Sequence, residues 1–355
     1  MLASFRSHRT DNLHERRLQY GSRPTLSRMA ETKSSGGELA ETHLEGEVAQ
    51  TEAAYRRAEL QFWNQYGIDP EEHFVELDTV GTTIRVQAVG SGDPVLLLHG
   101  SPTSGTIFAP LVASLDGFRC LIPDLPPGGL SAPFEITKDN VTTWLEHLVT
   151  DTLDAMGVER AHLVASSSGS ALAMKAALRA PERVQGIVHL GAPWLVEDIP
   201  VPFGEKLMLV PGVSRVLTAM TPGRRMQVSM LKSIGHGKSI EAGRIPDAYW
   251  AWSDALFAET GTYADQMRTL PAFRGSGLDY DPALKLRDDA LSRQGPTLVI
   301  WGTDEGLASK DDAQSLVDRI PGARLELVAD AGHLPWLDFP EEVAASVRRF
   351  LSDVE

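Results

Sequence analysis

The sequence predicts an α/β protein with a doubly wound, mostly parallel sheet. Short, mostly apolar runs recur along the chain, and such runs are typical of strands that are buried on both faces of a parallel sheet. Longer amphipathic segments separate most of these runs, so strands and helices alternate. Of the 355 residues, 42% are hydrophobic and 23% are charged, which suits a globular protein with a large core.

The strands are expected in a definite order. Two short strands, joined by a turn at Val80–Gly81, come first: His73–Leu77 and Thr83–Ala88. Four buried strands follow: Pro94–His99, Phe118–Ile122, Ala161–Ala165 and Val184–Leu190. Two more strands come after a gap: Thr297–Trp301 and Arg324–Val328. Helices are expected between them at about 106–115, 138–156, 169–180, 310–319 and 340–352. The alternation stops between about 194 and 290, a stretch that we interpret as a helical cap inserted before the last two strands.

The N-terminal part differs in composition from this α/β core. Residues 1–28 carry six arginines against two acids, whereas residues 31–78 carry twelve acids against three basic residues. We interpret residues 1–48 as a disordered or poorly ordered tail, with Met29 as a possible true start, followed by a helix from about Ala49 to Tyr66. The core would then comprise residues 49–193 and 291–355, and the cap residues 194–290.

Charge and cysteine content exclude several classes of function. The net charge of −15 argues against binding of nucleic acid or anionic membranes, which needs a basic surface. Cys120 is the only cysteine, so the chain can form neither an internal disulfide nor a cysteine zinc cluster. No apolar run reaches the length of a membrane span, and no loop has the spacing of a phosphate or dinucleotide site. We therefore expect no cofactor, no metal and a small-molecule substrate. We expect a cytoplasmic location, or a mitochondrial one if the Arg- and Ser-containing residues 1–28 are a transit peptide.

Three polar loops follow apolar strands, at the sheet edge where open α/β sheets bind ligands. They are His99–Pro102, Ala165–Gly169 and Asp330–Pro335. A serine hydroxyl becomes nucleophilic only when a base removes its proton and a sharp strand-to-helix turn exposes it, and this turn needs small residues two positions before and after the serine. Ala165 and Gly169 meet that requirement around Ser167.

His333 is the candidate base because it follows the last strand, downstream of both the serine and an acidic pair. That pair, Asp304-Glu305, follows the strand that ends at Trp301. An acid of this kind orients the imidazole and stabilises its cation. Either member of the pair could take the role.

Four motifs accompany the serine, the acid and the histidine. They are His99–Phe108 (H-G-x-P with a following aromatic), Pro123–Ser131, Leu298–Glu305 (strand plus acid) and His333–Glu342. In these motifs, in their spacing and in the order serine, acid, histidine, residues from about 73 to 352 resemble the α/β-hydrolase superfamily. The surroundings look like the epoxide-hydrolase and haloalkane-dehalogenase branch, but Ser167 stands where that branch has an aspartate nucleophile and Ser168 where it has a halide-binding tryptophan.

The resemblance implies the α/β-hydrolase fold and a role for each residue. Ser167 would be the nucleophile, His333 the base and Glu305 the acid, with Asp304 as the alternative acid. The backbone N–H groups of Ser101 and Ser168 would form the oxyanion hole. Two further residues, Phe108 and Trp194, are candidate pocket walls.

A serine nucleophile changes the expected reaction. Attack at carbon would leave a serine ether, which activated water cannot cleave, so dehalogenation and epoxide opening are disfavoured. Acyl transfer suits serine, and our leading hypothesis is a serine hydrolase that cleaves a small, fairly apolar ester, lactone or related acyl compound. Two alternatives remain: a carbon–carbon bond hydrolase or cofactor-free perhydrolase with the same triad, and a non-catalytic ligand-binding or signalling protein on the hydrolase fold.

Overall fold

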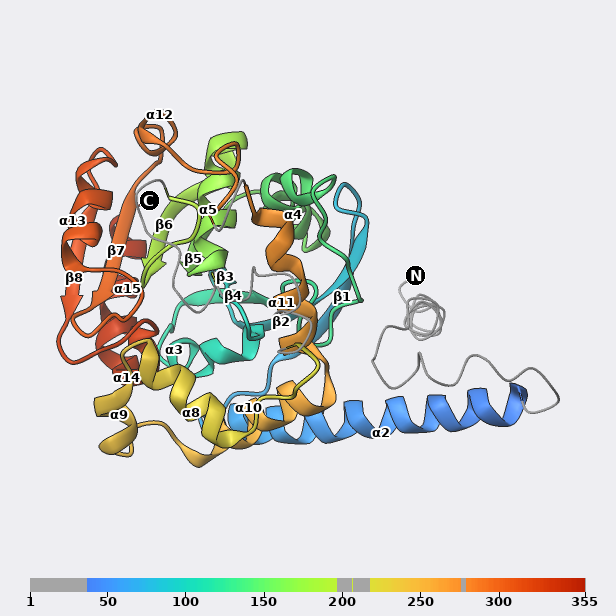
Figure 1. Cartoon of the computed structure of the whole chain (residues 1–355). Coiled ribbons are helices and arrows are strands. Elements are labelled where there is room, and N and C mark those ends of the chain that lie inside the picture. The colour runs from blue at the N-terminus through green and yellow to red at the C-terminus, as the bar shows by residue number, and fades with distance from the viewer. Residues whose placement is uncertain (1–36, 197–205, 207–217, 276–278, 355) are drawn as a thin grey trace.

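The computed structural model of the chain describes residues 37–196, 206, 218–275 and 279–354. Within them, eight strands form one sheet in the order β1-β2-β4-β3-β5-β6-β7-β8 (Figure 1). Strand β2 is antiparallel to both of its neighbours, and the other pairs are parallel. The strands are β1 (Glu71–Leu77), β2 (Thr82–Gly90), β3 (Asp93–Leu98), β4 (Phe118–Pro123), β5 (Ala161–Ser166), β6 (Val184–Leu190), β7 (Thr297–Gly302) and β8 (Arg324–Val328).

The expected strands are confirmed, each to within two residues of its predicted ends. Every residue of strands β5 and β7 is buried, as their apolar sequences require. Because these strands are parallel, their carboxyl ends meet at one edge of the sheet. The loops that carry Ser167, Asp304 and Glu305 all leave from that edge.

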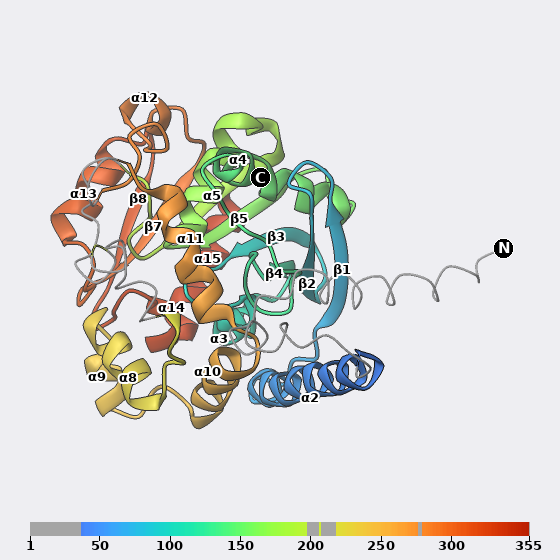
Figure 2. The same cartoon turned by 45° about the vertical axis from the view of Figure 1, so that its right-hand side comes forward.

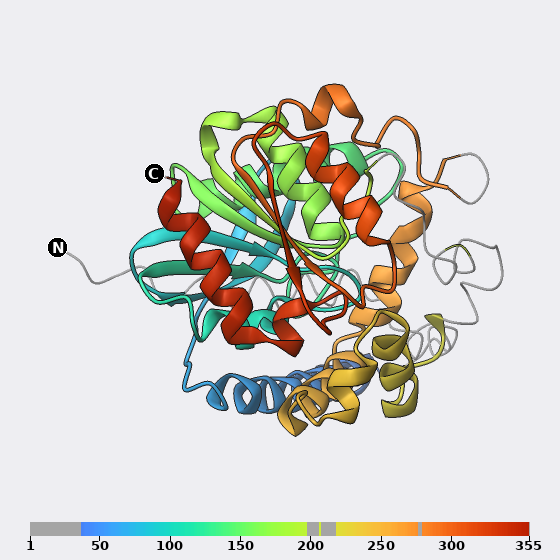
Figure 3. The ribbon, with the colours of Figure 1, turned by 90° about the vertical axis from the view of Figure 1, so that its left-hand side faces the viewer.

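Helices cover both faces of the sheet, which confirms the doubly wound α/β fold. One face packs against α3 (Ala109–Val112) and α15 (Pro340–Asp353). The other packs against α4 (Val141–Ala155), α5 (Ser168–Arg179) and α13 (Lys310–Asp318). In Figure 3 the sheet lies between the red helix α15 and the green and orange-red helices α5 and α13. Shorter helical turns complete the layers: η1 (Gly105–Phe108), η2 (Pro181–Arg183) and α14 (Pro335–Asp338).

A helical segment lies between β6 and β7, before the last two strands, as the sequence predicted. Its helices are α8 (Arg224–Ser233), α9 (Gly237–Glu241), α10 (Asp247–Glu259), α11 (Thr262–Phe273) and the short α12 (Asp288–Leu291). We call α8 to α11 the inserted helices. The expected cap limits of 194 and 290 stay a prediction, because residues 197–205, 207–217 and 276–278 lie outside the described residues.

The N-terminal helix is longer than the sequence analysis expected. Helix α2 runs from Gly37 to Asn64, so it begins within the segment that the sequence analysis interpreted as a disordered or poorly ordered tail. Residues 37–48 contain four Glu and two Leu, which are good helix formers. The rest of the expected tail, residues 1–36, lies outside the described residues. None of the helices described, including this one, is long and apolar enough to cross a membrane.

Helix α2 lies beside α10, one of the inserted helices, in both Figures 1 and 2. The ring of Phe62 stacks on Trp252 of α10, with ring centroids 5.4 Å apart. Tyr55 accepts a hydrogen bond from the indole Nε1 of Trp252 at 3.4 Å. The helix therefore joins the inserted helices to the α/β core.

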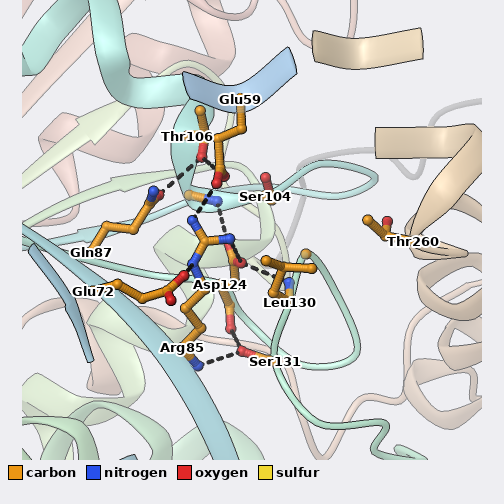
Figure 4. A network of polar contacts seen from close by, with 12 residues as sticks. Glu59, Glu72, Arg85, Gln87, Ser104, Thr106, Asp124, Leu130, Ser131 and Thr260 are labelled. Carbon is orange, nitrogen blue, oxygen red and sulfur yellow. Dashed lines mark hydrogen bonds and ion pairs between the residues drawn. The ribbon is translucent and has the colours of Figure 1, made fainter. Parts of the chain in front are cut away.

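A buried ionic network ties the same helix to the loop after β3 (Figure 4). Arg85 of β2 contacts three carboxylates: Glu59 of α2 at 2.6 Å, Glu72 at 2.9 Å and Asp124 at 3.4 Å. The carboxylate of Glu59 also accepts a hydrogen bond from Thr106, and that of Asp124 accepts one from the backbone N–H of Gly105. Ion pairs and hydrogen bonds of this network thus fix the loop that starts at His99.

Candidate active site

Ser167 sits at the sharp turn between β5 and α5. Its φ of 53° and ψ of −119° are unusual for a residue other than glycine, and such backbone conformations persist only where neighbours hold them. The carbonyl oxygen of Ser167 accepts hydrogen bonds from the backbone N–H of Ser170 at 3.0 Å and of Trp194 at 3.2 Å. The turn therefore presents the serine side chain at the carboxyl edge of the sheet.

Glycines allow the backbone to close around this turn. A Cβ atom at Gly169 would lie 2.2 Å from the carbonyl oxygen of Leu98, and one at Gly100 would lie 2.8 Å from the Cβ of Ser167. Neither contact is sterically possible, so the small residue expected two positions after Ser167 is required by close approach to β3.

His333 and Glu305 form a buried pair. The Nδ1 atom of His333 lies 2.7 Å from Oε2 of Glu305. Their side chains are only 4% and 1% exposed. Glycine also shapes this contact, because a Cβ at Gly191 would lie 2.2 Å from the carbonyl oxygen of His333. Glu305 thus orients the imidazole through Nδ1 and leaves Nε2 on the opposite side of the ring.

The carboxylate of Glu305 is held by backbone as well as by His333. It accepts hydrogen bonds from the N–H groups of Ala192 at 3.2 Å and Leu307 at 2.9 Å. Burial alone would raise the pKa of Glu305, but the charge of His333 and the hydrogen bonds from His333, Leu307 and Ala192 together lower that pKa. Glu305 is therefore a carboxylate at neutral pH.

Asp304, the alternative acid, lies elsewhere. Its carboxylate is 2.9 Å from Nζ of Lys238 in α9, and its side chain is 28% exposed. The structure therefore brings Glu305, and not Asp304, to His333.

A cavity of about 510 Å³ opens at this point, and both Ser167 and His333 line it. The Nε2 atom of His333 is buried and makes no hydrogen bond with any of the described residues. A neutral imidazole whose Nδ1 donates to a carboxylate has an unprotonated Nε2, which can accept a proton. The site thus combines a serine hydroxyl and a free basic nitrogen at the wall of one cavity.

The inserted helices supply most of the apolar cavity wall. Their contribution includes Met226, Met230, Leu231, Tyr249, Phe257 and Met267. Trp194, an expected pocket wall, lines the cavity too. The expectation for Phe108 is corrected: this ring is fully buried and stacks on Trp336 at 5.1 Å, and it is Trp336 that lines the cavity. The apolar character of Phe108 indicated burial but could not show on which side of the wall the ring lies.

The two residues expected to form an oxyanion hole flank the turn. Ser101 lines the cavity. Ser168 is the first residue of α5, so its N–H is one of the first four of the helix, which have no partner within the helix.

His99 cannot act as a base, because both of its ring nitrogens are engaged. It is fully buried, its Nδ1 contacts the carbonyl of Gly100 and its Nε2 accepts a hydrogen bond from Leu125 N–H. Burial lowers the pKa of His99 to about 4.

Comparison with known proteins identifies the family. The sequence profile of the alpha/beta hydrolase family matches residues 95–346. The chain belongs to this family. Its described residues contain no group of three or more His, Cys, Asp or Glu side chains that could hold a metal ion.

Several named proteins are similar to this alpha/beta hydrolase. It is 26% identical to a 2-hydroxymuconate semialdehyde hydrolase of Pseudomonas putida, over 79% of its own chain and 94% of that protein. It is also 26% identical to a cis-3-alkyl-4-alkyloxetan-2-one decarboxylase of Shewanella oneidensis, over 80% of its own chain and 89% of that protein. Among solved structures it resembles a carboxylesterase of Bacillus subtilis, with a TM-score of 0.63, 24% identity, and coverage of 86% of this chain and 99% of that one.

Sequence reasoning missed two side chains of this alpha/beta hydrolase that contact the His333 loop. They are His236, from the turn between α8 and α9, and Asp338, from α14. The sequence offered a signal for each: His236 stands between two glycines, and Asp338 follows His333 by five positions. Neither signal was specific, because a turn explains the first and a solvated helix end explains the second.

Proposed function

We propose that this alpha/beta hydrolase is a serine hydrolase that cleaves a small, uncharged, fairly apolar ester, lactone or related acyl compound. One observation carries the proposal. Nδ1 of His333 forms a hydrogen bond with the buried carboxylate of Glu305, whereas Nε2 has no partner among the described residues. The ring lines the same cavity as Ser167. Nucleophilic catalysis by serine uses a histidine that an acid orients and whose second nitrogen is open to the hydroxyl, and these observations support that role for His333.

In the proposed mechanism, Nε2 of His333 removes the proton of the Ser167 hydroxyl as its oxygen attacks the substrate carbonyl. Glu305 orients the imidazole and stabilises the cation that forms. The N–H groups of Ser101 and Ser168 would hold the oxyanion, and one such donor stabilises the transition state by about 3–4 kcal/mol. His333 then gives its proton to the leaving alcohol. Water, activated by the same nitrogen, hydrolyses the acyl-enzyme and restores Ser167.

The cavity supports an uncharged substrate. Its described lining residues include no Lys or Arg, so a substrate carboxylate would find no cationic partner there. An unpaired buried charge is costly. The inserted helices would act as a cap, with Met226, Met230 and Met267 adapting to the acyl group. The similarity to a decarboxylase of dialkyl oxetanones, which are four-membered lactones, supports the same substrate class.

Carbon–carbon bond hydrolysis is the second candidate. It is favoured by the similarity to the 2-hydroxymuconate semialdehyde hydrolase over nearly the whole length of that protein. The same serine and histidine could serve that reaction. A muconate-type substrate carries a carboxylate, however, and the described cavity wall does not offer a counter-charge.

A fluorophosphonate probe followed by intact-mass measurement tests the proposal. We expect one probe adduct on the wild-type protein and none on Ser167→Ala. Ser166→Ala is the matched control, because Ser166 is the adjacent serine, fully buried in β5. It should label as the wild type does. Folded wild-type protein that takes up no probe would instead indicate a non-catalytic ligand-binding protein.

Substrate profiling separates the two enzymatic candidates. Purified protein should be assayed with acyl esters of graded chain length, alkyl lactones, and diketones with and without a carboxylate. We expect kcat/KM for a neutral ester to exceed kcat/KM for an ester of the same size that carries a carboxylate by at least about tenfold. The reason is that one buried unpaired charge costs more than about 1.4 kcal/mol. A preference for the carboxylated diketone would favour carbon–carbon hydrolysis.

A further inference from the structure

The turn between α8 and α9 lies directly against the loop that carries His333. Three consecutive backbone N–H groups of that loop find their partners there or in Asp338. Gly332 N–H donates to Asp338 at 2.8 Å, and His333 N–H donates to the carbonyl of Ile234 at 2.9 Å. Leu334 N–H donates to Nε2 of His236 at 3.1 Å. Two of the three donors thus end on the inserted helical segment.

Glycines make this approach possible on both sides. A Cβ at Gly332 would lie 2.7 Å from the carbonyl carbon of Gly235. A Cβ at Gly235 would lie 2.0 Å from the carbonyl oxygen of Asp304, and one at Gly306 would lie 2.3 Å from that of Ser233. The turn therefore contacts the loop of Glu305 as closely as it contacts the loop of His333.

His236 is fully buried and its hydrogen bonds fix its tautomer. Because Leu334 N–H donates to Nε2, that nitrogen is the acceptor and the proton is on Nδ1. Nδ1 lies 2.9 Å from the carboxylate of Asp338, whose side chain is also fully buried. Asp338 thus orients His236 and binds Gly332 at the same time. The pair clamps the loop on both sides of His333.

We infer that His236, oriented by Asp338, is a positioning residue for the catalytic base, so that the inserted helices set the place of His333. The inference rests on the proposed role of His333. A shift of the loop at His333 would move the imidazole and change the approach of Nε2 to Ser167. A displacement of about 1 Å can lower the rate about a hundredfold. A second contact acts in the same sense: Lys238, two residues after His236, pairs with Asp304 and Asp330.

Single substitutions at His236 separate its two hydrogen bonds. His236→Leu removes both, and we expect kcat to fall about ten- to hundredfold with KM within about twofold of the wild type. His236→Asn keeps a donor near Asp338 but removes the acceptor for Leu334, so it should lose activity as well. His236→Gln puts an amide near the position of Nε2, where its oxygen can accept from Leu334, and should restore most of kcat. The Asn and Gln variants decide the question if the Leu variant does not fold.

The control is Thr262→Val. Thr262 is also buried in the inserted helices and also accepts from a core backbone group, Gly129 N–H at 3.0 Å, but it does not line the cavity. This variant should lose thermal stability as the His236 variants do and keep kcat. The second readout is the downfield proton resonance of the His333–Glu305 hydrogen bond, identified by its loss in His333→Gln. We expect it to shift or broaden in the Leu and Asn variants only.

Two results would overturn the inference: kcat within twofold of the wild type with an unchanged resonance in folded His236→Leu or His236→Asn, or an equal loss of kcat in Thr262→Val. The proposed function is tested separately. Turnover that survives Ser167→Ala would reject that function whatever the His236 variants do. Loss of turnover in Ser167→Ala beside full turnover in the His236 variants would reject the positioning role alone.

Discussion

Two buried clusters in this protein pair a carboxylate with a nitrogen base at nearly the same distance. Glu305 lies 2.7 Å from His333, and Glu59 lies 2.6 Å from Arg85. In the Arg85 cluster the guanidinium is surrounded by carboxylates, and each oxygen of Asp124 also receives a backbone N–H. In the His333 cluster the carboxylate is equally well held, but one ring nitrogen has no described partner and its ring lines a cavity.

The difference shows how the same fold uses buried charge in two ways. Burial alone would lower the pKa of Arg85, but its carboxylate neighbours raise that pKa, so the guanidinium keeps its proton. From β2 it can bind α2, β1 and the loop after β4 together, but it cannot transfer a proton. An imidazole with one nitrogen fixed and one free can do so. We therefore expect reactivity from the His333 cluster and structural support from the Arg85 cluster.

The largest effect is expected where the reactive cluster is broken. Glu305→Gln should keep the shape of the site but present an amide to Nδ1 of His333, and removal of the orienting charge costs about a thousandfold or more in kcat in serine hydrolases. Asp304→Asn should change kcat by less than about threefold, because Asp304 pairs with Lys238 near the surface. Steady-state kinetics on the best ester would show this. A larger loss in Asp304→Asn than in Glu305→Gln would contradict our assignment of the acid.

A smaller effect, on stability, is expected where the supporting cluster is broken. Arg85→Met leaves Glu59 and Asp124 buried without their cation, and such a change costs about 3–5 kcal/mol. Arg349→Met is the matched control, since Arg349 pairs with Glu326 at 3.0 Å but is 58% exposed, and its loss should cost less than about 1 kcal/mol. Urea unfolding measures both. Equal destabilisation by the two variants would show that the Arg85 network is not a core element.

The sequence could predict the features that depend on neighbouring residues. Strand positions followed from apolar runs, because a strand buried on both faces leaves that pattern whatever surrounds it. The Ser167 turn followed from small flanking residues, and the structure shows the close contact of Gly169 with Leu98 that requires one of them. Local rules of this kind are written in neighbouring residues.

What the sequence could not predict depends on contacts between distant segments. Only the fold shows that Glu305 and not Asp304 meets His333, because adjacent residues at a strand end differ chiefly in direction. The fold likewise shows that His236 reaches a loop about a hundred positions away, and that Phe108 lies behind the cavity wall. Helix α2 begins at Gly37, well before Ala49, where the sequence analysis expected the first helix to begin.

The smallest effect is expected at a third kind of buried base, His189 in β6. It is fully buried, and neither ring nitrogen has a partner among the described residues. Burial lowers its pKa to about 4, whereas an unfolded histidine titrates near 6.5, so the unfolded chain binds more protons between these values. The stability that neutral His189 allows is therefore complete above about pH 6.5 and is lost as the pH falls towards 4.

His189→Leu should remove this pH-dependent loss and leave stability at pH 7.5 unchanged or raise it by about 1 kcal/mol, because an apolar side chain needs no hydrogen bonds. Burial lowers the pKa of His99 to about 4 as well, so His99→Leu should remove a similar pH-dependent loss. At pH 7.5, however, His99→Leu should destabilise the protein by about 1–3 kcal/mol, because it leaves Leu125 N–H and the Gly100 carbonyl without their partner. Urea unfolding at pH 7.5 and 5.0 distinguishes them. If His189→Leu destabilised the protein as much as His99→Leu, His189 would also make hydrogen bonds that stabilise the fold, and the contrast between the two histidines would be wrong.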